Sequence, residues 1–417
     1  MKKRLMQLGL LLATFVMIFS CFTAAFTSTA QADQTKLEAK AAITMDAQTG
    51  QILFQQNANQ KLAVASCTKI LTLAVIEQDI TDGKLSWNQK IKINRKVAKT
   101  STDWHFSNVE LKAGHRYTVR SLCESMMIVS ADGSAEALAL ASAGSTAAFN
   151  KKMQAVAKKA GVHDAKIYNM IGLSNGELGS NGIKGVSKKA ENAFSAKDMA
   201  LISRYLVTKY PDALNITKAT NVEFKVDDKQ SYNMLNINGM LPNNGNAPKN
   251  GTMDGLKTGS TDKAGNCFVG TGIFNNRRLI TVVLGTDIHD YSKQFKETNK
   301  MLEAVQGAYQ LVTLKQPSDL KKLTNQVRVA HGKRKTVEIG LKQTAALWLP
   351  KGSKINQVSG QLTLSKGKRT IGQHKLRAPL KKGETVGQIK VTPIKGQPSL
   401  QLPVVSQQNV TKKSLMN

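Results

Sequence analysis

The 417-residue chain changes character at Lys315-Gln316-Pro317, and this break limits its possible folds more than any other feature. Upstream of it, apolar runs of helical length are mixed with shorter strand-like runs. Downstream, short alternating runs of β character are separated by Gly and Lys turns. A chain of this length can form two or three domains with separate apolar cores. We therefore expect an α/β domain followed by a small all-β sandwich domain.

The upstream region, 33–317, is predicted to form a sheet flanked by helices. Two strands around a turn that ends at Gly50 form a hairpin, and Ser66 lies near the start of a buried helix. Lys257-Thr258-Gly259 lies on one of several adjacent antiparallel strands. The other predicted elements are two core helices within 121–142 that break near Ser130, amphipathic helices over 147–160, 196–209 and 293–314, and a Gly-rich loop over 172–185.

The downstream region is predicted to be a basic β-sandwich domain over 318–405 with a polar C-terminal tail over 406–417. Residues 318–417 carry 20 Lys and Arg but three Asp and Glu, a net charge of +17. The polar tail contains no segment that can be identified as a membrane anchor. The strands are expected at 327–330, 336–341, 345–349, 361–364 and 386–393.

The N-terminus has the pattern of a secretory signal peptide. The basic residues at 2–4 precede 28 uncharged residues, which end in Ala30-Gln31-Ala32. Cleavage is expected after Ala32, so that 1–32 is the signal peptide. An uncleaved membrane anchor is the alternative, because 5–26 is long enough to span a bilayer. In both cases we expect an extracytoplasmic protein of the cell envelope, at the wall or the outer face of the membrane, or a secreted protein.

The predicted export changes which partners the positive net charge of the chain indicates. The formal net charge is +31, and +28 remains after loss of the three basic residues of the signal. In a cytoplasmic protein this charge would favour nucleic acid as a partner, whereas an exported protein meets anionic wall polymers and lipid head groups. We therefore expect no nucleic-acid partner, and contact with anionic wall polymers or a membrane surface.

The cysteines and histidines give no sign of a disulfide framework or of a metal site. Cleavage would leave Cys67, Cys123 and Cys267, an odd number, so at least one thiol is free and no structural disulfide is expected. Six scattered His, with neither an HExxH nor a CxxC pattern, argue against a protein-built zinc site. We expect no cofactor.

The segment Ser66-Cys67-Thr68-Lys69 pairs a hydroxyl with an amine. Residues three apart share a helix face, so Lys69 can point at the Ser66 hydroxyl from inside the fold. Serine is a poor nucleophile until a base takes its proton, and a buried lysine near other cations can be that base. The same spacing at Ser260, Ser318 and Ser365 does not begin an apolar helix. At Ser66 itself, the structural alternative is a helix cap beside a snorkelling lysine.

Two further short patterns follow in order, Ser130-Ala131-Asp132 and Lys257-Thr258-Gly259. Lys257 offers a cation for a substrate carboxylate, and Thr258 offers a hydroxyl. Gly259 lets a ligand approach the backbone closely. Together in this order, the three patterns are much less expected by chance than any one of them.

The three patterns resemble those of the penicillin-recognising serine enzymes. Within that superfamily the chain is similar to the D-alanyl-D-alanine carboxypeptidases, which are low-molecular-mass penicillin-binding proteins. The resemblance covers roughly 38–405 and implies a β-lactamase-like, transpeptidase-like catalytic domain. Further matching segments are Asp46-Ala47-Gln48-Thr49-Gly50, 169–173, 195–200 and 255–261.

The resemblance also implies a serine-type mechanism. Ser66 would attack the carbonyl of the penultimate D-alanine in a peptidoglycan stem pentapeptide, with Lys69 as the base. Water would then hydrolyse the acyl-enzyme, and β-lactams would acylate the same serine. The implied catalytic residues are Ser66, Lys69 and Ser130 (which relays a proton to the leaving D-alanine), and the implied substrate-binding residues are Asp132, Lys257, Thr258, Gly259 and Ser260, with the oxyanion hole made by backbone N–H groups of Ser66 and Ser260.

Asp132 departs from the family pattern, which has Asn at this position. An ionised Asp keeps an acceptor for the substrate amide but loses the donor. Its charge should also raise the pKa values of Lys69 and Lys257. We therefore expect slow acylation with a pH profile shifted to alkaline pH.

Three alternatives remain open at this stage. A class A β-lactamase would need a Glu that activates the deacylating water, and Glu177-Leu178-Gly179-Ser180-Asn181 matches a Glu-x-x-x-Asn pattern. A D,D-endopeptidase of the same superfamily would share all three motifs. A wall-binding protein with a weakened active site would fit Asp132 and the basic C-terminal region.

Overall fold

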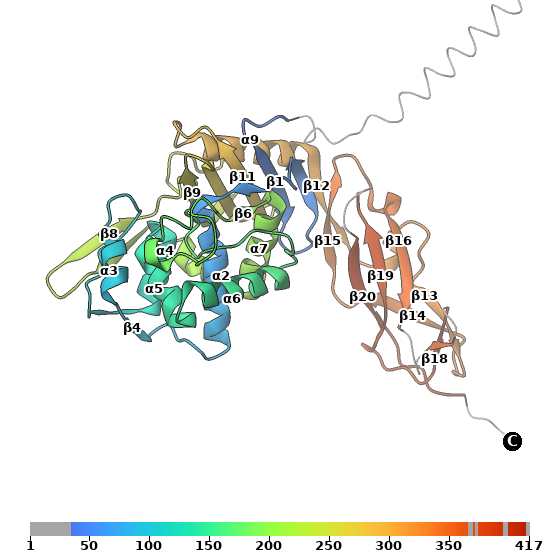
Figure 1. The fold of residues 1–417 in the computed structure, drawn as a ribbon. Coiled ribbons are helices and arrows are strands. Elements are labelled where there is room, and N and C mark those ends of the chain that lie inside the picture. Colours follow the sequence, from blue (N-terminus) through green and yellow to red (C-terminus); the bar gives the residue numbers. More distant parts are fainter. Residues whose placement is uncertain (1–34, 366–369, 372–373, 395–398, 414–417) are drawn as a thin grey trace, which may run out of the picture.

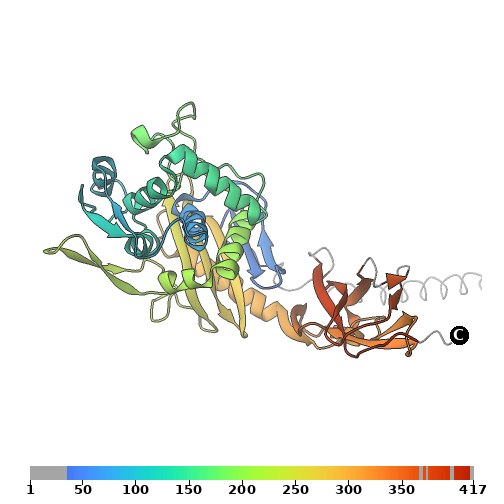
Figure 2. The ribbon, with the colours of Figure 1, turned by 90° about the horizontal axis from the view of Figure 1, so that it is seen from below.

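The computed structural model describes residues 35–365, 370–371, 374–394 and 399–413. The predicted signal peptide, 1–32, lies outside the described residues. The described chain forms an α/β lobe and an all-β lobe that lie side by side (Figures 1 and 2). None of the described helices is long and apolar enough to span a bilayer.

A five-stranded antiparallel sheet forms the centre of the first lobe, as the sequence predicts. Its strand order is β2-β1-β11-β10-β9, so β1 of the N-terminal hairpin pairs with β11, more than 200 residues later in the chain. In β11, the side chains of Ile280, Val282 and Leu284 face one core and those of Leu279 and Val283 face another. The strands are β1 (Ala41–Asp46), β2 (Ile52–Gln56), β9 (Thr252–Thr261), β10 (Gly265–Phe274) and β11 (Arg277–Thr286).

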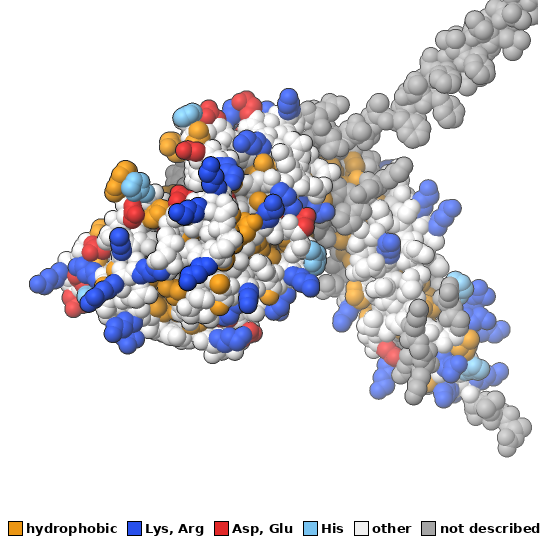
Figure 3. Space-filling model, in the orientation of Figure 1, with side chains coloured by type: hydrophobic (Ala, Val, Ile, Leu, Met, Phe, Trp, Pro, Cys, Tyr) orange, Lys and Arg blue, Asp and Glu red, His pale blue; other side chains and the backbone are white. Residues whose placement is uncertain are grey.

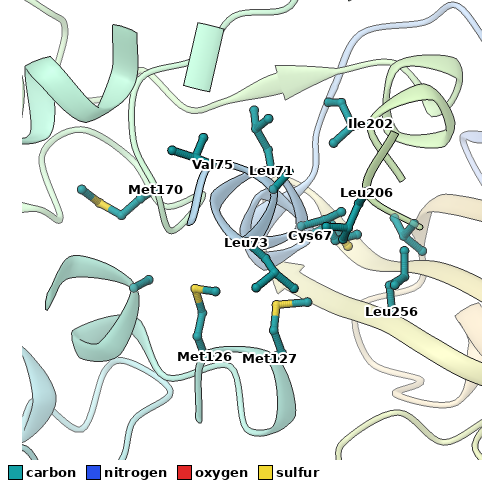
Figure 4. Packing of buried hydrophobic residues seen from close by; sticks show 14 of the residues in the cluster. Cys67, Leu71, Leu73, Val75, Met126, Met127, Met170, Ile202, Leu206 and Leu256 are labelled. Atoms are coloured by element: carbon teal, nitrogen blue, oxygen red, sulfur yellow. The ribbon is translucent and has the colours of Figure 1, made fainter. Parts of the chain in front are cut away.

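Helices cover both faces of this sheet. The core on one face surrounds α2, which is buried along almost its whole length. Figure 4 shows Leu73 of this helix pointing toward Met126 and Met127, and Val75 on the side of Met170. The opposite face is covered by α9. The helices are α2 (Lys69–Thr81), α3 (Arg95–Ser101), α4 (Val119–Ile128), α5 (Asp132–Ala143), α6 (Thr146–Lys159), α7 (Ala196–Lys209), α8 (Leu214–Thr217) and α9 (Lys293–Ala308).

Short elements complete the first lobe. The predicted break between two core helices near Ser130 is confirmed by the gap between α4 and α5, and the Gly-rich loop is confirmed apart from one short 3-10 turn. The paired short strands are β3 (Leu62–Ala63) with β6 (Ala193–Phe194), β4 (Lys90–Lys92) with β5 (Arg116–Thr118), and β7 (Asn221–Lys225) with β8 (Ser231–Leu235); the 3-10 turns of this lobe are η2 (Ala65–Thr68), η3 (Gly179–Asn181) and η4 (Pro211–Ala213).

The predicted helix over 293–314 is wrong in its last six residues. The helix α9 ends at Ala308, and Tyr309–Leu314 is a strand, β12, that pairs with β15 of the second lobe. Apolar residues continue at helical spacing through 305, 309 and 312, so the pattern within the segment does not reveal its end. The partner strand lies about 35 residues further along the chain, and only the folded structure brings the two together.

The second lobe is all-β, as predicted. A seven-stranded sheet, nearly barrel-like, encloses a core with the β12–β15 pair, and the core includes Leu314, Leu347 and Ile389. The predicted polar tail follows β20 along the lobe, with isolated bridges from Val410 to Leu380 and from Lys412 to Gly332. The strands are β12 (Tyr309–Leu314), β13 (Gln326–Ala330), β14 (Thr336–Leu341), β15 (Ala345–Pro350), β16 (Ser359–Leu364), β17 (Thr370–Ile371), β18 (Lys375–Arg377), β19 (Thr385–Thr392) and β20 (Leu400–Ser406), with 3-10 turns η5 (Pro317–Asp319) and η6 (Ile355–Gln357).

The buried Trp348 is a central contact between the two lobes. Side chains alternate along β15, so Leu347 and Leu349 enter the second core while Trp348 between them enters the first lobe. The Trp348 indole Nε1 donates to Asp46 Oδ2 at 2.8 Å, and its backbone exchanges two hydrogen bonds with the side chain of Gln51. Asp46 also receives Arg277 in a bidentate pair. The junction is therefore a satisfied buried polar network.

Candidate active site

Ser66 and Lys69 lie at the junction of the 3-10 turn η2 and the helix α2, near the helix start that the sequence predicts. The turn is tight, and Ala65 adopts a left-handed backbone conformation with φ of 47°. Gly172 makes this turn possible, because a Cβ there would lie 1.9 Å from the carbonyl oxygen of Ala65. The turn places Lys69 Nζ 2.7 Å from Ser66 Oγ.

Lys69 is completely buried among oxygen atoms. Besides Ser66, its ammonium group contacts Asp132 Oδ1 at 2.6 Å, Ser130 Oγ at 3.3 Å and the carbonyl oxygen of Ile171 at 3.5 Å. An ammonium group has three N–H donors, so the two longer contacts compete for one proton. The buried Lys69 is thus connected to both serines of the predicted site.

Ser130 and Asp132 come from the turn between α4 and α5. Ser130 has a φ of 66°, a conformation that non-glycine residues rarely adopt and that is found mainly where surrounding structure enforces it. The backbone N–H of Asp132 donates to the Ser107 carbonyl at 2.8 Å, which ties the turn to the segment after α3. Both side chains are buried and point to Lys69.

The pKa of Asp132 is raised by burial, which outweighs the opposing effects of the Lys69 and Lys257 charges. The direct 2.6 Å contact between Asp132 and Lys69 is the proximity that the sequence predicts. The Asp132 carboxylate therefore binds the amine of Lys69, the side chain that would have to act as the general base.

The third motif lies on β9 with Lys257 buried behind the site. Its Nζ donates to the carbonyl of Thr258 at 3.0 Å. Burial and the charge of Lys69 lower the pKa of Lys257 to about 7, although Asp132 acts in the opposite direction. Asp132 raises the pKa of Lys257, as the sequence predicts, but desolvation of the buried ammonium group is the larger effect and the pKa lies below its ordinary value.

Gly259 allows β9 to pass directly beside the Ser66 turn. A Cβ at Gly259 would lie 2.6 Å from the Val64 carbonyl oxygen and 3.0 Å from the Ser66 backbone nitrogen. Any side chain here would force the strand and the turn apart. The next residue, Ser260, is exposed, and its hydroxyl donates to Asn266 Oδ1 at 2.8 Å.

A cavity of about 280 Å³ joins the three motifs. Ser66, Ser130, Thr258, Gly259 and Ser260 line it, while Lys69, Asp132 and Lys257 are buried behind this lining. The motif analysis did not identify the remaining lining residues, because they come from segments that carry no motif of their own: Ser107, Ile237, Asn266, Tyr291, Gln294 and Phe295.

Two asparagines that do not line the cavity support the Ser66 turn. Asn192 Nδ2 donates to Thr68 Oγ1 at 3.1 Å and to the Asn169 carbonyl at 2.8 Å. Asn169 Oδ1 in turn accepts from the backbone N–H groups of Ile171 and Gly172. Asn169 belongs to a segment that matches the family, but its supporting role depends on a contact with Asn192 that the sequence does not show.

Glu177 of the possible β-lactamase pattern lines a different pocket from the one that contains Ser66. Its Oε2 accepts from the backbone N–H of Ser174 at 2.7 Å. The three cysteines of the described chain, Cys67, Cys123 and Cys267, are all free and buried. Among the described residues, no group of three or more His, Cys, Asp or Glu could hold a metal ion.

Comparison with known proteins identifies, over most of the chain, the same family that the three sequence motifs resemble. A family model described as D-alanyl-D-alanine carboxypeptidase matches residues 27–288, and one described as the penicillin-binding protein 5 C-terminal domain matches 309–412. The chain is 29% identical over 401 residues to D-alanyl-D-alanine carboxypeptidase DacC of Escherichia coli, covering 95% of this chain and 90% of that one. It is 25% identical over 378 residues to DacF of Bacillus subtilis, covering 90% and 86%.

Solved structures agree with this assignment. A peptidoglycan synthesis regulatory factor (PBP3) from Streptococcus pneumoniae has a TM-score of 0.76 and 30% identity, covering 90% of this chain and all of that one. Penicillin-binding protein D2 from Listeria monocytogenes, in its cefotaxime-bound form, has a TM-score of 0.53 and 28% identity, covering 65% of this chain and 98% of that one. The chain therefore belongs to the D-alanyl-D-alanine carboxypeptidase family, the low-molecular-mass penicillin-binding proteins.

Proposed function

We propose that the protein is a serine D-alanyl-D-alanine carboxypeptidase that removes the terminal D-alanine from peptidoglycan stem pentapeptides, with Ser66 as its nucleophile. The observation that carries this assignment is the buried Lys69 amine, 2.7 Å from Ser66 Oγ and 3.3 Å from Ser130 Oγ, at a cavity lined by Thr258 and Ser260. Family membership supports the reaction type.

The acylation step follows from these contacts. Neutral Lys69 takes the proton of Ser66 as Oγ bonds to the carbonyl carbon of the penultimate D-alanine. The resulting oxyanion is stabilised by backbone N–H groups of Ser66 and Ser260. When the C–N bond breaks, Ser130 passes a proton to the leaving amine. Water then attacks the ester, which releases the shortened peptide and restores Ser66.

The leaving D-alanine is bound through its carboxylate. Lys257 lies behind Thr258, and its ammonium form attracts the carboxylate while the Thr258 hydroxyl donates a hydrogen bond. Because the pKa of Lys257 is about 7, part of the free enzyme lacks this cation at neutral pH. A bound carboxylate favours the charged form and draws the proton back. Asp132 accepts from the substrate amide, whereas the family Asn could also donate.

Penicillin labelling tests the nucleophile. One acyl group should appear on the peptide that contains Ser66, and fragmentation must place it there and not on the adjacent Cys67. Ser66→Ala should abolish the label. Ser318→Ala is a matched control, because Ser318 also precedes a lysine by three residues but lies in the second lobe. Labelling that persists in Ser66→Ala would refute the assignment.

Three activities of the same superfamily are distinguished by the substrates they turn over. A carboxypeptidase should release D-alanine from a pentapeptide much faster than it turns over nitrocefin. A β-lactamase would show the reverse, and an endopeptidase would prefer cross-linked peptides. The separation of Glu177 from the Ser66 cavity supports the carboxypeptidase over the β-lactamase.

The second lobe carries a cluster of basic side chains that supports a further role in contact with anionic wall polymers or a membrane surface. Three hydrogen bonds hold its loops side by side: the backbone N–H groups of Lys333 and Lys413 donate to the carbonyls of Thr411 and His331, and that of Lys382 donates to the side-chain Oδ1 of Asn409. Figure 3 shows Lys and Arg side chains gathered at the end of the lobe far from the α/β lobe. We call this cluster the basic tip: Lys333, Arg334, Lys335, Lys381, Lys382, Lys412 and Lys413, all exposed.

Salt dependence tests this role. Binding of the full-length protein to anionic wall polymer or anionic vesicles should weaken sharply as salt rises, because exposed charges are screened over about 10 Å at 0.1 M salt. Reversal of the charges at Lys333, Lys335, Lys381 and Lys382 should weaken it as well. Unchanged retention of that variant would assign the lobe to a spacer role. The proposed substrate would place the protein in the cell envelope.

A further inference from the structure

The strand β8 forms a free edge of the α/β lobe. It pairs with β7 and with no other strand that the structure describes, and all of its residues except Met234 are exposed. Exposed edges are usually protected by Lys, Pro or a β-bulge. The β8 sequence, Ser-Tyr-Asn-Met-Leu, contains neither residue, and its register with β7 does not shift. The outer edge of β8 is therefore open to a further strand.

The register of the hairpin shows which backbone groups of β8 point outward. Hydrogen bonds at its two ends fix this register: Val226 N–H to the Gln230 carbonyl at 2.9 Å, and Asn236 N–H to the Thr220 carbonyl at 2.8 Å. Hydrogen-bonded and non-hydrogen-bonded pairs alternate along an antiparallel ladder. The N–H and C=O groups of Ser231, Asn233 and Leu235 therefore point away from β7. None of these groups has a hydrogen-bond partner among the described residues.

An open pocket of about 640 Å³ lies at this edge. Residues 232–235 of β8 line it together with the segment 101–110, which ends α3 and follows it, and Figure 1 shows β8 and α3 at the same end of the lobe. Apolar parts of the lining face water, since Trp104 is 85% exposed and Leu235 is 65% exposed. A strand added to β8 would direct alternate side chains into this pocket and would cover that apolar surface.

The pocket is acidic although the chain carries a net charge of +31. Asp103 and Glu110 line it, and its described lining contains no Lys or Arg. A cationic segment therefore meets complementary charge here, whereas an anionic one is repelled. A second copy of β8 has no charged side chain, so pairing between two β8 edges would leave the carboxylates of both copies without a counter-charge.

We propose that β8 and this pocket form a docking site for an extended segment of a partner protein in which apolar and basic residues alternate. The segment adds to β8 as a third strand, and its backbone pairs with the outward groups of Asn233 and Leu235. The pocket receives its apolar side chains, and Asp103 and Glu110 attract its basic ones. Ile237, two residues beyond β8, lines the active-site cavity, so the bound partner lies beside that cavity.

A peptide probe tests the chemistry of the partner. The probe is acetyl-Lys-Val-Lys-Val-Lys-Val-Lys-amide, and calorimetric titration measures its binding to the full-length protein. Replacement of all its lysines by glutamate should weaken binding by about 10-fold, because two exposed carboxylates lose their counter-charges. N-methylation of the valines, or of the lysines, blocks the backbone groups on one side of the strand. One of these two methylated peptides should lose binding, and full binding by both would overturn the proposal.

Hydrogen exchange locates the bound probe. Saturating probe should slow the exchange of backbone amides in 231–235, because the outward N–H groups of Asn233 and Leu235 become hydrogen-bonded. Exchange in 221–225, on the other strand of the hairpin, should not change. Protection of β9 in place of β8 would put the probe at the active site and would overturn the proposal.

Matched variants assign the contacts. Asn233→Pro removes an outward N–H but no bond to β7, and it should weaken binding by about 10-fold. Glu223→Pro changes the residue directly opposite on β7 and should leave the affinity unchanged. Glu110→Gln should weaken binding by about 2- to 5-fold, and Asp228→Asn, an exposed acid outside the pocket, should not. Unchanged affinity in both Asn233→Pro and Glu110→Gln would overturn the assignment.

Two further measurements test other occupants. Protein acylated by penicillin should bind the probe as tightly as free protein, because Ser66 does not line this pocket. Loss of binding on acylation would place the probe in the active-site cavity and overturn the proposal. A dimer in sedimentation that Asn233→Pro dissociates would identify a second copy as the occupant and would overturn it as well. The titration and exchange experiments need no acylation, so they test the docking site even if the proposed nucleophile is wrong.

Discussion

The two lobes use lysine in opposite ways. In the α/β lobe, Lys69 and Lys257 are among the largest fully buried side chains of the protein. In the all-β lobe, every lysine that the structure describes from residue 315 onward is exposed. A buried ammonium group loses its hydration and depends on a few protein partners, whereas an exposed one keeps its water.

Buried lysines therefore act through local chemistry, whereas exposed lysines act through long-range charge. The pKa of a buried lysine can be moved to where the amine is available as a base or as a switchable cation, as the value of about 7 for Lys257 illustrates. Exposed lysines contribute little individually but act together on a polyanion. Changes to the buried lysines should therefore have large effects, and changes to exposed lysines should have small ones.

The largest effect is expected for Lys69→Met, which keeps the length of the side chain but removes the amine. Acylation by penicillin should fall by about 100- to 10,000-fold, because a general base contributes a factor of this size. The variant should also lose about 3 kcal/mol of stability, because Asp132 is left buried without its cation. The double variant Lys69→Met/Asp132→Asn should regain stability without acylation. Full acylation in Lys69→Met would show that another group is the base.

Trp348→Ala should produce the next largest effect and tests whether the lobes are independent. It should lower the free energy of unfolding by about 3–5 kcal/mol, because a large buried ring is lost from the core of the α/β lobe. Trp348→Phe should cost about 1–3 kcal/mol through loss of the bond to Asp46. Denaturant unfolding measures both, with Trp104→Phe as the control, since Trp104 is 85% exposed. No change in Trp348→Ala would mean that the junction adds nothing to stability.

The pH dependence of stability tests the burial of Lys257. Its pKa falls from 10.5 to about 7 on folding, so the unfolded chain binds more protons between these two values. The free energy of unfolding should therefore rise with pH across this window, by at most about 1.4 kcal/mol per pH unit from this group. Lys257→Met lacks this contribution. From pH 7 to pH 10, the free energy of unfolding of the natural protein should therefore rise relative to that of Lys257→Met. A constant difference between the two proteins would contradict the lowered pKa.

Asp132→Asn should acylate faster at neutral pH. Asp132 Oδ1 holds the Lys69 amine across 2.6 Å, and loss of this contact should free the amine to take the proton of Ser66. The rate of penicillin labelling at pH 7 measures this. Asp132→Ala is the control, because it removes the charge without supplying the amide of Asn. If Asp132→Asn labels no faster at pH 7, the electrostatic explanation fails.

The smallest effect is expected for a single lysine of the basic tip. Lys335→Gln should change the free energy of unfolding by less than about 0.5 kcal/mol, as surface substitutions usually do. Penicillin labelling at Ser66 should be unchanged. A loss of stability comparable to that of Lys69→Met would remove the contrast between the two lobes.

Much of the site could be predicted because its chemistry is encoded locally. Ser66 and Lys69 are three residues apart, and helix geometry alone places them on one face. The order of the three motifs and the break after Pro317 indicated the family and the two lobes. Local patterns of this kind are set by backbone periodicity, which does not depend on distant partners.

Other features depend on distant partners. The end of α9 at Ala308 is decided by β15, and the fit of the Ser66 turn is decided by Gly172 and Gly259. The lining of the cavity by Ser107, Ile237 and Tyr291 also comes from segments without motifs.

The sequence by itself therefore determined which chemical groups this protein has and roughly in which elements they lie. The tertiary structure alone decided how those groups are charged. Asp132 raises the pKa of Lys257, as the sequence predicts, but the fold also buries Lys257 beside Lys69, and the net result is a pKa of about 7. The physical reason is that hydration is lost only when many segments close around a side chain, and that loss can exceed the attraction of one nearby carboxylate.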